Sequence, residues 1–323
     1  MKKLLWNYFR QAHKEHHLLR DGDKLVIRKA VVPAAGLGTR LLSATKEQPK
    51  EMLPIFAADN DGVLCLKPML QQIFEQIFDF GLREFYFVVG RGKRAIVDHF
   101  IPDREFVQRL NANAKSSQAV QLQIFYEKIE ASAIAWVNQP EPKGFGDAVL
   151  EADRVVGKEP FLVHAGDTYI IPGNQDILAK LTETHARGQA EVTLTLKEVH
   201  DPRMYGVAEV TETGAQSLLV NRVTEKPSHP ASKLAIMPVY VFNSTIFQAI
   251  RNTPPGRGGE IQLTDAIQKL IDDGRKVQAI KLSENDIRLD IGTPETYREA
   301  LELSYQDALA KKTNPMLRSA EDT

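Results

Sequence analysis

The chain has 323 residues, with 41 Lys and Arg against 42 Asp and Glu and a formal net charge of −1. This length suits one large α/β domain or two domains, and 43% hydrophobic residues exclude a disordered chain. The balanced charge argues against a protein that coats nucleic acid, and the single Cys65 excludes a disulfide framework or a Cys-rich zinc site. No apolar run approaches the ~20 residues of a membrane helix and no signal peptide is visible, so we expect a cytoplasmic protein.

Residues 1–28 form a basic N-terminal extension. Its apolar positions recur at nearly helical spacing, which favours a solvated amphipathic helix laid on the domain over a membrane or RNA contact. The main domain is expected over 29–310, followed by a polar, flexible tail over 311–323. Because no linker rich in Pro, Gly or Ser divides the domain, we predict two lobes of one unit, 29–190 and 191–310.

Short apolar runs predict strands at 29–33, 84–89, 121–126, 133–137, 160–165, 191–196, 206–210, 218–223, 233–242 and 277–281. Helical periodicity predicts helices at 68–80, 93–100, 147–156, 176–187, 246–251, 261–273 and 294–310. Strands and helices alternate in the first half, whereas strands predominate after about residue 190. The pattern predicts an α/β protein with a mostly parallel sheet, a mixed second lobe and ligands at the carboxyl ends of the strands.

The first strand breaks into a run of small residues, Ala34-Ala35-Gly36-Leu37-Gly38-Thr39-Arg40. Such a run lets the backbone approach a phosphate and direct its N–H groups at the oxygens. Leu41 stands where the dinucleotide fingerprint needs its third glycine, which disfavours a Rossmann dehydrogenase, and no P-loop motif follows. A plain tight turn is the alternative. The cations Arg40, Lys46 and Lys50 favour a polyanionic ligand instead.

Three further positions carry polar groups that suit a ligand, and two of them, Gln139 and Asp167, follow predicted strands. Gln139 opens a loop stiffened by two prolines, and its amide offers the donor and acceptor that suit a base edge, although a rigid strand-to-helix turn would look the same. Asp167 follows a buried strand, and Asp290 looks equivalent in the second half. Such a pair of carboxylates can hold Mg²⁺, while either one alone is more simply a cap. His99 and His164 lie in apolar surroundings and are interpreted as packed residues.

From about residue 29 to 305 the chain resembles bacterial-type UTP–glucose-1-phosphate uridylyltransferases, a branch of the sugar-1-phosphate nucleotidylyltransferases. The resemblance is carried, in order, by residues 30–54, 89–100, 139–142, 205–207, 225–227, 259–267 and 290–294. The glycine-rich opening is shared across the wider family. The runs Gly-Arg-Gly-Lys-Arg-Ala-Ile and Gly-Glu-Ile-Gln-Leu-Thr-Asp are far more specific to the uridylyltransferase branch.

The resemblance implies a Rossmann-like nucleotide-diphospho-sugar transferase fold, with a mixed, mostly parallel central sheet and helices on both faces. It implies an enzyme that makes UDP-glucose and pyrophosphate from UTP and glucose 1-phosphate by Mg²⁺-dependent in-line attack on the α-phosphate. The partners are those small molecules, without nucleic acid or membrane, and a homo-oligomer (dimer or tetramer) is expected.

Carried over residue by residue, the resemblance assigns the site as follows: nucleotide binding to Ala34, Ala35, Gly36, Gly38, Thr39, Gln139 and Gly144; catalytic charge to Arg40, Lys50 and Lys226; sugar binding to Gly206, Glu225 and Lys226; and Mg²⁺ to Asp167 and Asp290.

Three features depart from the family pattern. Ser43 stands where the family usually has Pro, and the stretch 54–68 is longer and more polar. Asp147 replaces a family His and adds negative charge near an anionic site, and Thr168 replaces the second Asp of a Gly-Asp-Asp run. The charge of Asp147 bears on nucleotide preference more than on reaction type. Three alternatives stay open: a thymidylyltransferase, a uridylyltransferase for another sugar 1-phosphate such as N-acetylglucosamine 1-phosphate, and an inactive regulator that binds sugar nucleotides.

Overall fold

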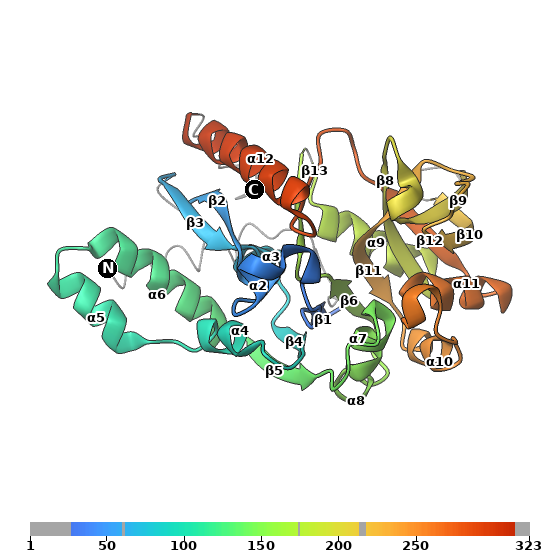
Figure 1. The fold of residues 1–323 in the computed structure, drawn as a ribbon, viewed down its shortest axis with the longest axis horizontal. Helices are drawn as coiled ribbons and strands as arrows, with labels where there is room; N and C mark the ends of the chain where they lie inside the picture. Colours follow the sequence, from blue (N-terminus) through green and yellow to red (C-terminus); the bar gives the residue numbers. More distant parts are fainter. Residues whose placement is uncertain (1–26, 60–61, 174, 213–217, 314–323) are drawn as a thin grey trace.

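A nine-stranded mixed sheet runs through the computed structural model, which describes residues 27–59, 62–173, 175–212 and 218–313 (Figure 1). In spatial order its strands are β5 (Ala133–Asn138), β4 (Glu84–Val89), β1 (Lys29–Pro33), β6 (Phe161–His164), β11 (Leu234–Phe242), β8 (Val192–Glu198), β12 (Val277–Lys281), β10 (Leu218–Glu225) and β9 (Gly206–Glu212). Two small antiparallel sheets pair β2 (Pro54–Ala58) with β3 (Leu64–Pro68) and β7 (Thr168–Ile171) with β13 (Ile287–Asp290).

The longer helices are α3 (Met69–Phe80), α5 (Arg104–Ala112), α6 (Ser116–Glu130), α9 (Ile177–Gly188), α11 (Leu263–Asp272) and α12 (Pro294–Thr313). The shorter ones are α2 (Leu42–Thr45), α4 (Arg94–His99), α7 (Phe145–Glu151), α8 (Asp153–Val156) and α10 (Thr245–Arg251). None of these helices is long and apolar enough to span a bilayer. The amphipathic helix expected near the N-terminus lies outside the described residues, and α12 continues three residues beyond the predicted Ala310.

The strands of the central sheet run in both directions. β5, β4, β1 and β6 are mutually parallel, and β8 is parallel to β12. β11 runs antiparallel to both β6 and β8, and β10 runs antiparallel to β12 and β9. The sheet is therefore mixed, and only β11 and β10 run against the direction of its other strands, in keeping with the expected mixed and mostly parallel sheet.

Two hydrophobic cores cover the two faces of the sheet. Along β1, Ala30 and Val32 point into a core shared with α3, α6 and α9, whereas Val31 points into the core under α7, α10 and α11. Successive side chains of a strand alternate between faces, so one buried strand serves both cores. Phe161 and Phe247 stack in the second core, with ring centres 5.0 Å apart. The expected helices on both faces are present.

The strand predicted at 121–126 was wrong, because this segment lies inside α6. Ala119, Phe125 and Ile129 are buried, with Leu122 partly buried, and this spacing of three to four residues is helical. Over only six residues, the alternation of apolar and polar side chains suggested a strand, whereas the helical spacing is visible only over a longer stretch of sequence.

The polar stretch 54–68 forms the hairpin of β2 and β3, which the sequence did not predict. Helix α12 packs on this hairpin: the hydroxyl of Tyr297 donates to the carbonyl of Pro54 at 3.0 Å, and the N–H of Phe56 donates to Ser304 at 3.2 Å. The last helix thereby packs beside strands from the beginning of the chain, as Figure 1 shows.

Candidate active site

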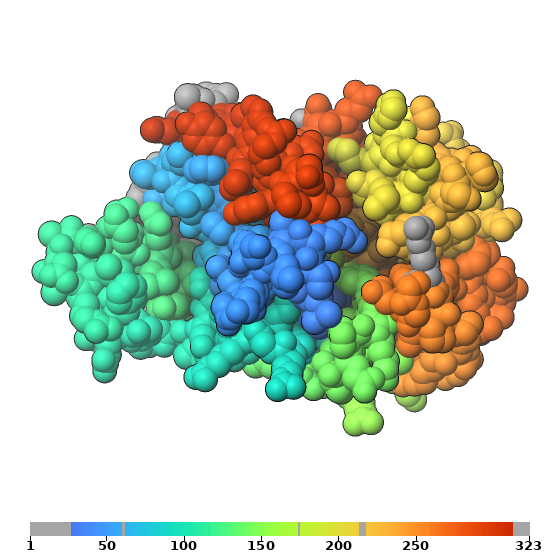
Figure 2. Space-filling model, viewed as in Figure 1, coloured from blue at the N-terminus to red at the C-terminus, as the bar shows by residue number. Residues whose placement is uncertain are grey.

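The four parallel strands end together at one edge of the sheet, and a predicted site segment follows three of them. The small-residue run follows β1, Gln139 follows β5, and Asp167 comes shortly after β6. Glycine makes the convergence possible: a Cβ on Gly166 would lie 3.1 Å from the carbonyl oxygen of Pro33. Figure 2 shows a hollow between the blue segment that carries the first loop and the yellow and orange second lobe.

Lys50 lies between the glycine-rich loop and Asp167. Its Nζ is 2.5 Å from Asp167 Oδ2, and a Cβ on Gly36 would lie 3.6 Å from Lys50 Cε. Burial acts to lower the pKa of Lys50, but the negative charges of Asp167, Glu51 and Asp290 outweigh it and raise that pKa. Burial likewise acts to raise the pKa of Asp167, and the Lys50 ammonium reverses this and holds it below its usual range. The expected phosphate cation and the expected metal carboxylate are thus partners.

A second ion pair supports the segment that carries Lys50. Lys93 Nζ lies 2.8 Å from Glu51 Oε2, and the two side chains are only 7% and 2% exposed. Burial raises the pKa of Glu51, although Lys93 and Lys50 oppose this. The pair ties the start of α4 to the 3₁₀ turn Lys50–Met52. The sequence analysis did not single out either residue for this contact.

The small sheet of β7 and β13 brings the two predicted metal ligands together. Its register places Asp290 opposite Thr168, which directly follows Asp167. The Thr168 hydroxyl lies 3.4 Å from Asp290 Oδ2 and 3.5 Å from Asp167 Oδ1. Arg40 is also close, because a Cβ on Gly292 would lie 3.7 Å from Arg40 Nη1. Positions 122 residues apart therefore form one cluster.

Arg288 links this cluster to Tyr205, just before β9, and was not among the predicted site residues. Its Nη2 lies 2.6 Å from Asp290 Oδ2, and its Nη1 donates to the Tyr205 hydroxyl at 3.1 Å. The available signal was its position two residues before Asp290, since residues i and i+2 of a strand share a face. Beyond Tyr205, the backbone N–H of Lys226 donates to the Tyr205 carbonyl at 2.9 Å.

The predicted sugar-binding residues gather beside β9 and β10. Gly206 pairs directly with Glu225, whose Oε2 accepts a hydrogen bond from the Thr264 hydroxyl at 2.6 Å. Gly206 must lack a side chain, because a Cβ there would lie 2.8 Å from that hydroxyl. Lys226 has a φ of +40°, in the left-handed region that side chains avoid, and its Nζ is 3.1 Å from Glu225 Oε1. Strained backbone of this kind is common at functional sites.

The loop after β5 interlocks with the segment before α11. The N–H of Ile261 donates to the Lys143 carbonyl at 2.7 Å, and the N–H of Gly146 donates to the Ile261 carbonyl at 3.0 Å. Gly144 has a φ of +108°, and a Cβ there would lie 2.8 Å from the Cβ of Glu260. The segment 259–267, which carries part of the resemblance, therefore packs against the residues that directly follow the segment 139–142.

Gln139 itself is held by Asp147. The Gln139 Nε2 donates to Asp147 Oδ2 at 2.7 Å and to the Gly144 carbonyl at 3.2 Å. Both residues are buried: Gln139 is 4% exposed and Asp147 is 8% exposed. Asp147 thus faces Gln139, which the sequence analysis did not anticipate.

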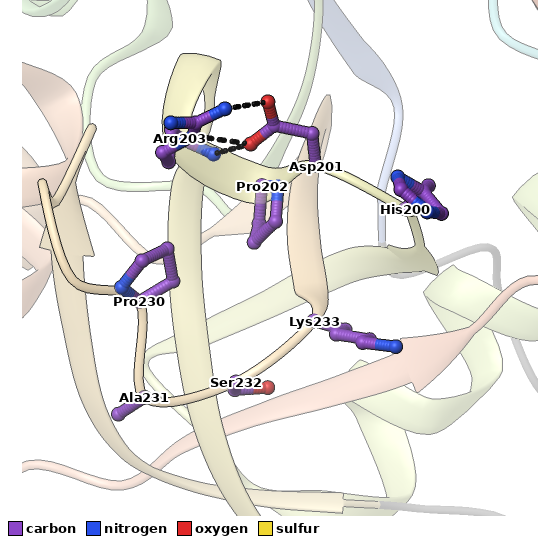
Figure 3. Close-up of a pocket in the computed structure, with 8 residues that line it drawn as sticks. All are labelled: His200, Asp201, Pro202, Arg203, Pro230, Ala231, Ser232 and Lys233. Atoms are coloured by element: carbon purple, nitrogen blue, oxygen red, sulfur yellow. Dashed lines mark hydrogen bonds and ion pairs between the residues drawn. The ribbon is translucent and has the colours of Figure 1, made fainter.

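A pocket of about 410 Å³ lies elsewhere on the second lobe, between residues 200–203 and 230–233 (Figure 3). None of the predicted site residues lines it. Its guanidinium, Arg203, forms an ion pair with Asp201 at 2.6 Å, which lowers the pKa of Asp201 to about 2. The charges of Arg203 and Asp201 therefore largely neutralise each other.

The fold and the site define a class of protein. Residues 29–306 match the family model described as nucleotidyl transferase, and the chain belongs to this family.

Two individual relatives are similar to this chain over most of its length. The chain is 33% identical over 305 residues to the UTP–glucose-1-phosphate uridylyltransferase YngB of Bacillus subtilis. The matched region covers 90% of this chain and 99% of that protein. It is 38% identical over 253 residues to another UTP–glucose-1-phosphate uridylyltransferase of B. subtilis, covering 76% and 80%.

Solved structures agree with this comparison. A UDP-glucose pyrophosphorylase complexed with UDP-glucose is 30% identical, with a TM-score of 0.74 over 87% of this chain and 99% of that one. A UTP-bound pyrophosphorylase from Acinetobacter baumannii is also 30% identical, with a TM-score of 0.74 over 86% and 93%. The resemblance read from the sequence is confirmed, and so is the mixed α/β nucleotidyltransferase fold.

Proposed function

We propose that the protein is a UTP–glucose-1-phosphate uridylyltransferase, which joins UTP and glucose 1-phosphate to give UDP-glucose and pyrophosphate. The observation that carries the proposal is a continuous set of contacts from the glycine-rich loop to the second lobe. It passes from Lys50 to Asp167, Thr168 and Asp290, and then through Arg288 to Tyr205. The names of the relatives support the choice of substrates.

The chemistry requires two polyanions to approach each other. Two like unit charges 4 Å apart repel by about 4 kcal/mol at an effective dielectric constant of ~20, and several such pairs meet. Arg40 and Lys50 are proposed to neutralise the nucleotide phosphates and Lys226 the sugar phosphate. A phosphate oxygen of glucose 1-phosphate then attacks the α-phosphorus in line, and pyrophosphate leaves. This nucleophile is already ionised at pH 7, so no general base is needed.

Asp167 and Asp290 have the donor chemistry for Mg²⁺. Mg²⁺ prefers oxygen ligands and is typically bound by one or two carboxylates together with substrate phosphates. The two carboxylates flank one hydroxyl, and the described residues contain no group of three or more His, Cys, Asp or Glu side chains that could form a complete protein cage. When bound there, the ion would screen phosphate charge.

The remaining assignments complete the proposal. The backbone of Ala34, Ala35, Gly36, Gly38 and Thr39 would contact the nucleotide phosphates, Gln139 and the Gly144 backbone would contact the uracil, and Gly206 and Glu225 would hold the glucose. In this arrangement residues 29–190 form the nucleotide lobe and residues 191–310 the sugar-phosphate lobe. A homo-oligomer, dimer or tetramer, remains part of the proposal.

The test is an assay of pyrophosphate release. Purified protein is supplied with Mg²⁺ and UTP, dTTP, CTP or ATP, each with glucose 1-phosphate or N-acetylglucosamine 1-phosphate. The proposal expects the highest kcat/KM for UTP with glucose 1-phosphate. A preference for dTTP or for the acetylated sugar would replace it with another transferase, and nucleotide-sugar binding without turnover would indicate a regulator.

A further inference from the structure

The buried contact between Asp147 and Gln139 determines which end of the Gln139 amide is available to a ligand. An amide side chain has a donor end, Nε2, and an acceptor end, Oε1. Gln139 Nε2 faces the Asp147 carboxylate at 2.7 Å and the Gly144 carbonyl at 3.2 Å. A carboxylate and a carbonyl can only accept hydrogen bonds, so the nitrogen must be the end that points at them.

The acceptor end of Gln139 is consequently the end left for a base. Among the residues that the structure describes, Oε1 has no hydrogen-bond partner, whereas Nε2 has two. Gln139 is only 4% exposed, so solvent cannot easily stabilise the reversed amide. Reversal would place Oε1 against two acceptors and leave buried polar groups without hydrogen bonds, which is unfavourable.

We propose that Asp147 is a positioning residue that makes the protein select uracil-type bases over cytosine, by fixing the Gln139 amide with Oε1 toward the base. This inference rests on the proposed function. Uracil and thymine carry an N–H donor at N3, from which Oε1 can accept a hydrogen bond. Cytosine carries a lone pair at N3, which Oε1 repels. Asp147 therefore discriminates UTP and dTTP from CTP, but does not discriminate UTP from dTTP.

Substitution of Asp147 tests this selection. Asp147→Leu removes the nearer, charged acceptor and leaves only the Gly144 carbonyl at 3.2 Å from Nε2. The amide can then turn more readily, so the ratio of kcat/KM for UTP to that for CTP falls at least about tenfold. The UTP to dTTP ratio stays within about threefold of wild type. Asp147→Asn keeps a side-chain carbonyl that can accept from Nε2, and it retains most of the preference for UTP over CTP.

The controls separate this role from a general loss of structure. Each ratio is measured on one preparation, so the fraction of folded enzyme cancels. Glu151→Leu removes a carboxylate one turn further along α7 and leaves both ratios unchanged. In a Gln139→Ala background, Asp147→Leu has no further effect on the UTP to CTP ratio. If Asp147→Leu is insoluble, Asp147→Ser gives the same readout, because its hydroxyl is too short to reach Nε2.

Two results would overturn the inference: an unchanged UTP to CTP ratio in Asp147→Leu, or an equal fall in the UTP to CTP and UTP to dTTP ratios. Failure of the proposed function is recognised separately, because the wild-type protein would then release no pyrophosphate from UTP and glucose 1-phosphate. In that case calorimetric titration of wild type and Asp147→Leu with UDP and CDP decides the role of Asp147. An equal UDP to CDP affinity ratio in both proteins would reject it.

Discussion

Removal of one partner of the buried ion pair between Glu51 and Lys93 should strongly destabilise the folded protein. Glu51→Gln leaves the Lys93 ammonium, 7% exposed, without its carboxylate at 2.8 Å. Breaking a buried pair in this way costs about 3–5 kcal/mol, because a buried charge loses its compensation. For 323 residues, an unfolding entropy of about 2.1 cal/mol/K per residue converts this loss to a fall in Tm of about 4–7 °C.

Differential scanning calorimetry at pH 7 measures this shift. The exposed pair between Lys46 and Glu47, 3.7 Å apart, provides the matched control, because its side chains are 77% and 87% exposed. Glu47→Gln should change the free energy of unfolding by less than about 1 kcal/mol. The double variant Glu51→Leu/Lys93→Met removes both charges together and should recover most of the lost stability, since well-packed apolar replacements are often neutral.

The pair also bears on the site, because Glu51 directly follows Lys50. Loosening this turn should lower kcat in Glu51→Gln beyond any loss of folded protein. A Tm within 1 °C of wild type in Glu51→Gln would refute the reasoning, as would a double variant less stable than the single one. Either result would mean that the contact does not desolvate the two charges.

Other predictions concern the site and the pH dependence of stability. Lys226→Ala should abolish most turnover of glucose 1-phosphate while UTP still binds, measured by steady-state kinetics and calorimetry, with Lys233→Ala at an exposed position as control. Asp167→Asn and Asp290→Asn should each cripple Mg²⁺-dependent activity, and an unchanged rate against Mg²⁺ concentration would count against their assignment. Burial lowers the pKa of His164 from 6.5 to about 4, so the unfolded chain takes up a proton at higher pH than the folded protein. The contribution of His164 to stability is therefore present above pH 6.5, and about 3 kcal/mol is lost as the pH falls to about 4. Urea unfolding across that range should show a shallower loss in His164→Phe, and an equal slope would contradict this.

Local sequence determined the elements whose signals are complete within one window. Helix α3 is an example: its buried positions recur at helical spacing, Pro68 precedes it, and Gly81 ends it with a φ of +118°. Strands β1, β4 and β12 also matched their predicted bounds, because their short apolar runs are buried on both faces. The glycine-rich loop and the residues after the parallel strands were therefore predictable as a site.

Only the tertiary structure decided how the site residues meet. The pairing of β7 with β13 joins Asp167 to Asp290 through Thr168, and Arg288 then links Asp290 to Tyr205. These contacts depend on the register of two four-residue strands more than 100 residues apart, and no local pattern encodes such a register. The same holds for Asp147. The sequence shows that this residue is negatively charged, but only the fold shows that its hydrogen-bond partner is Gln139. The sequence determined which charged and amide groups the proposed site contains, and long-range strand pairing determined which of them lie together.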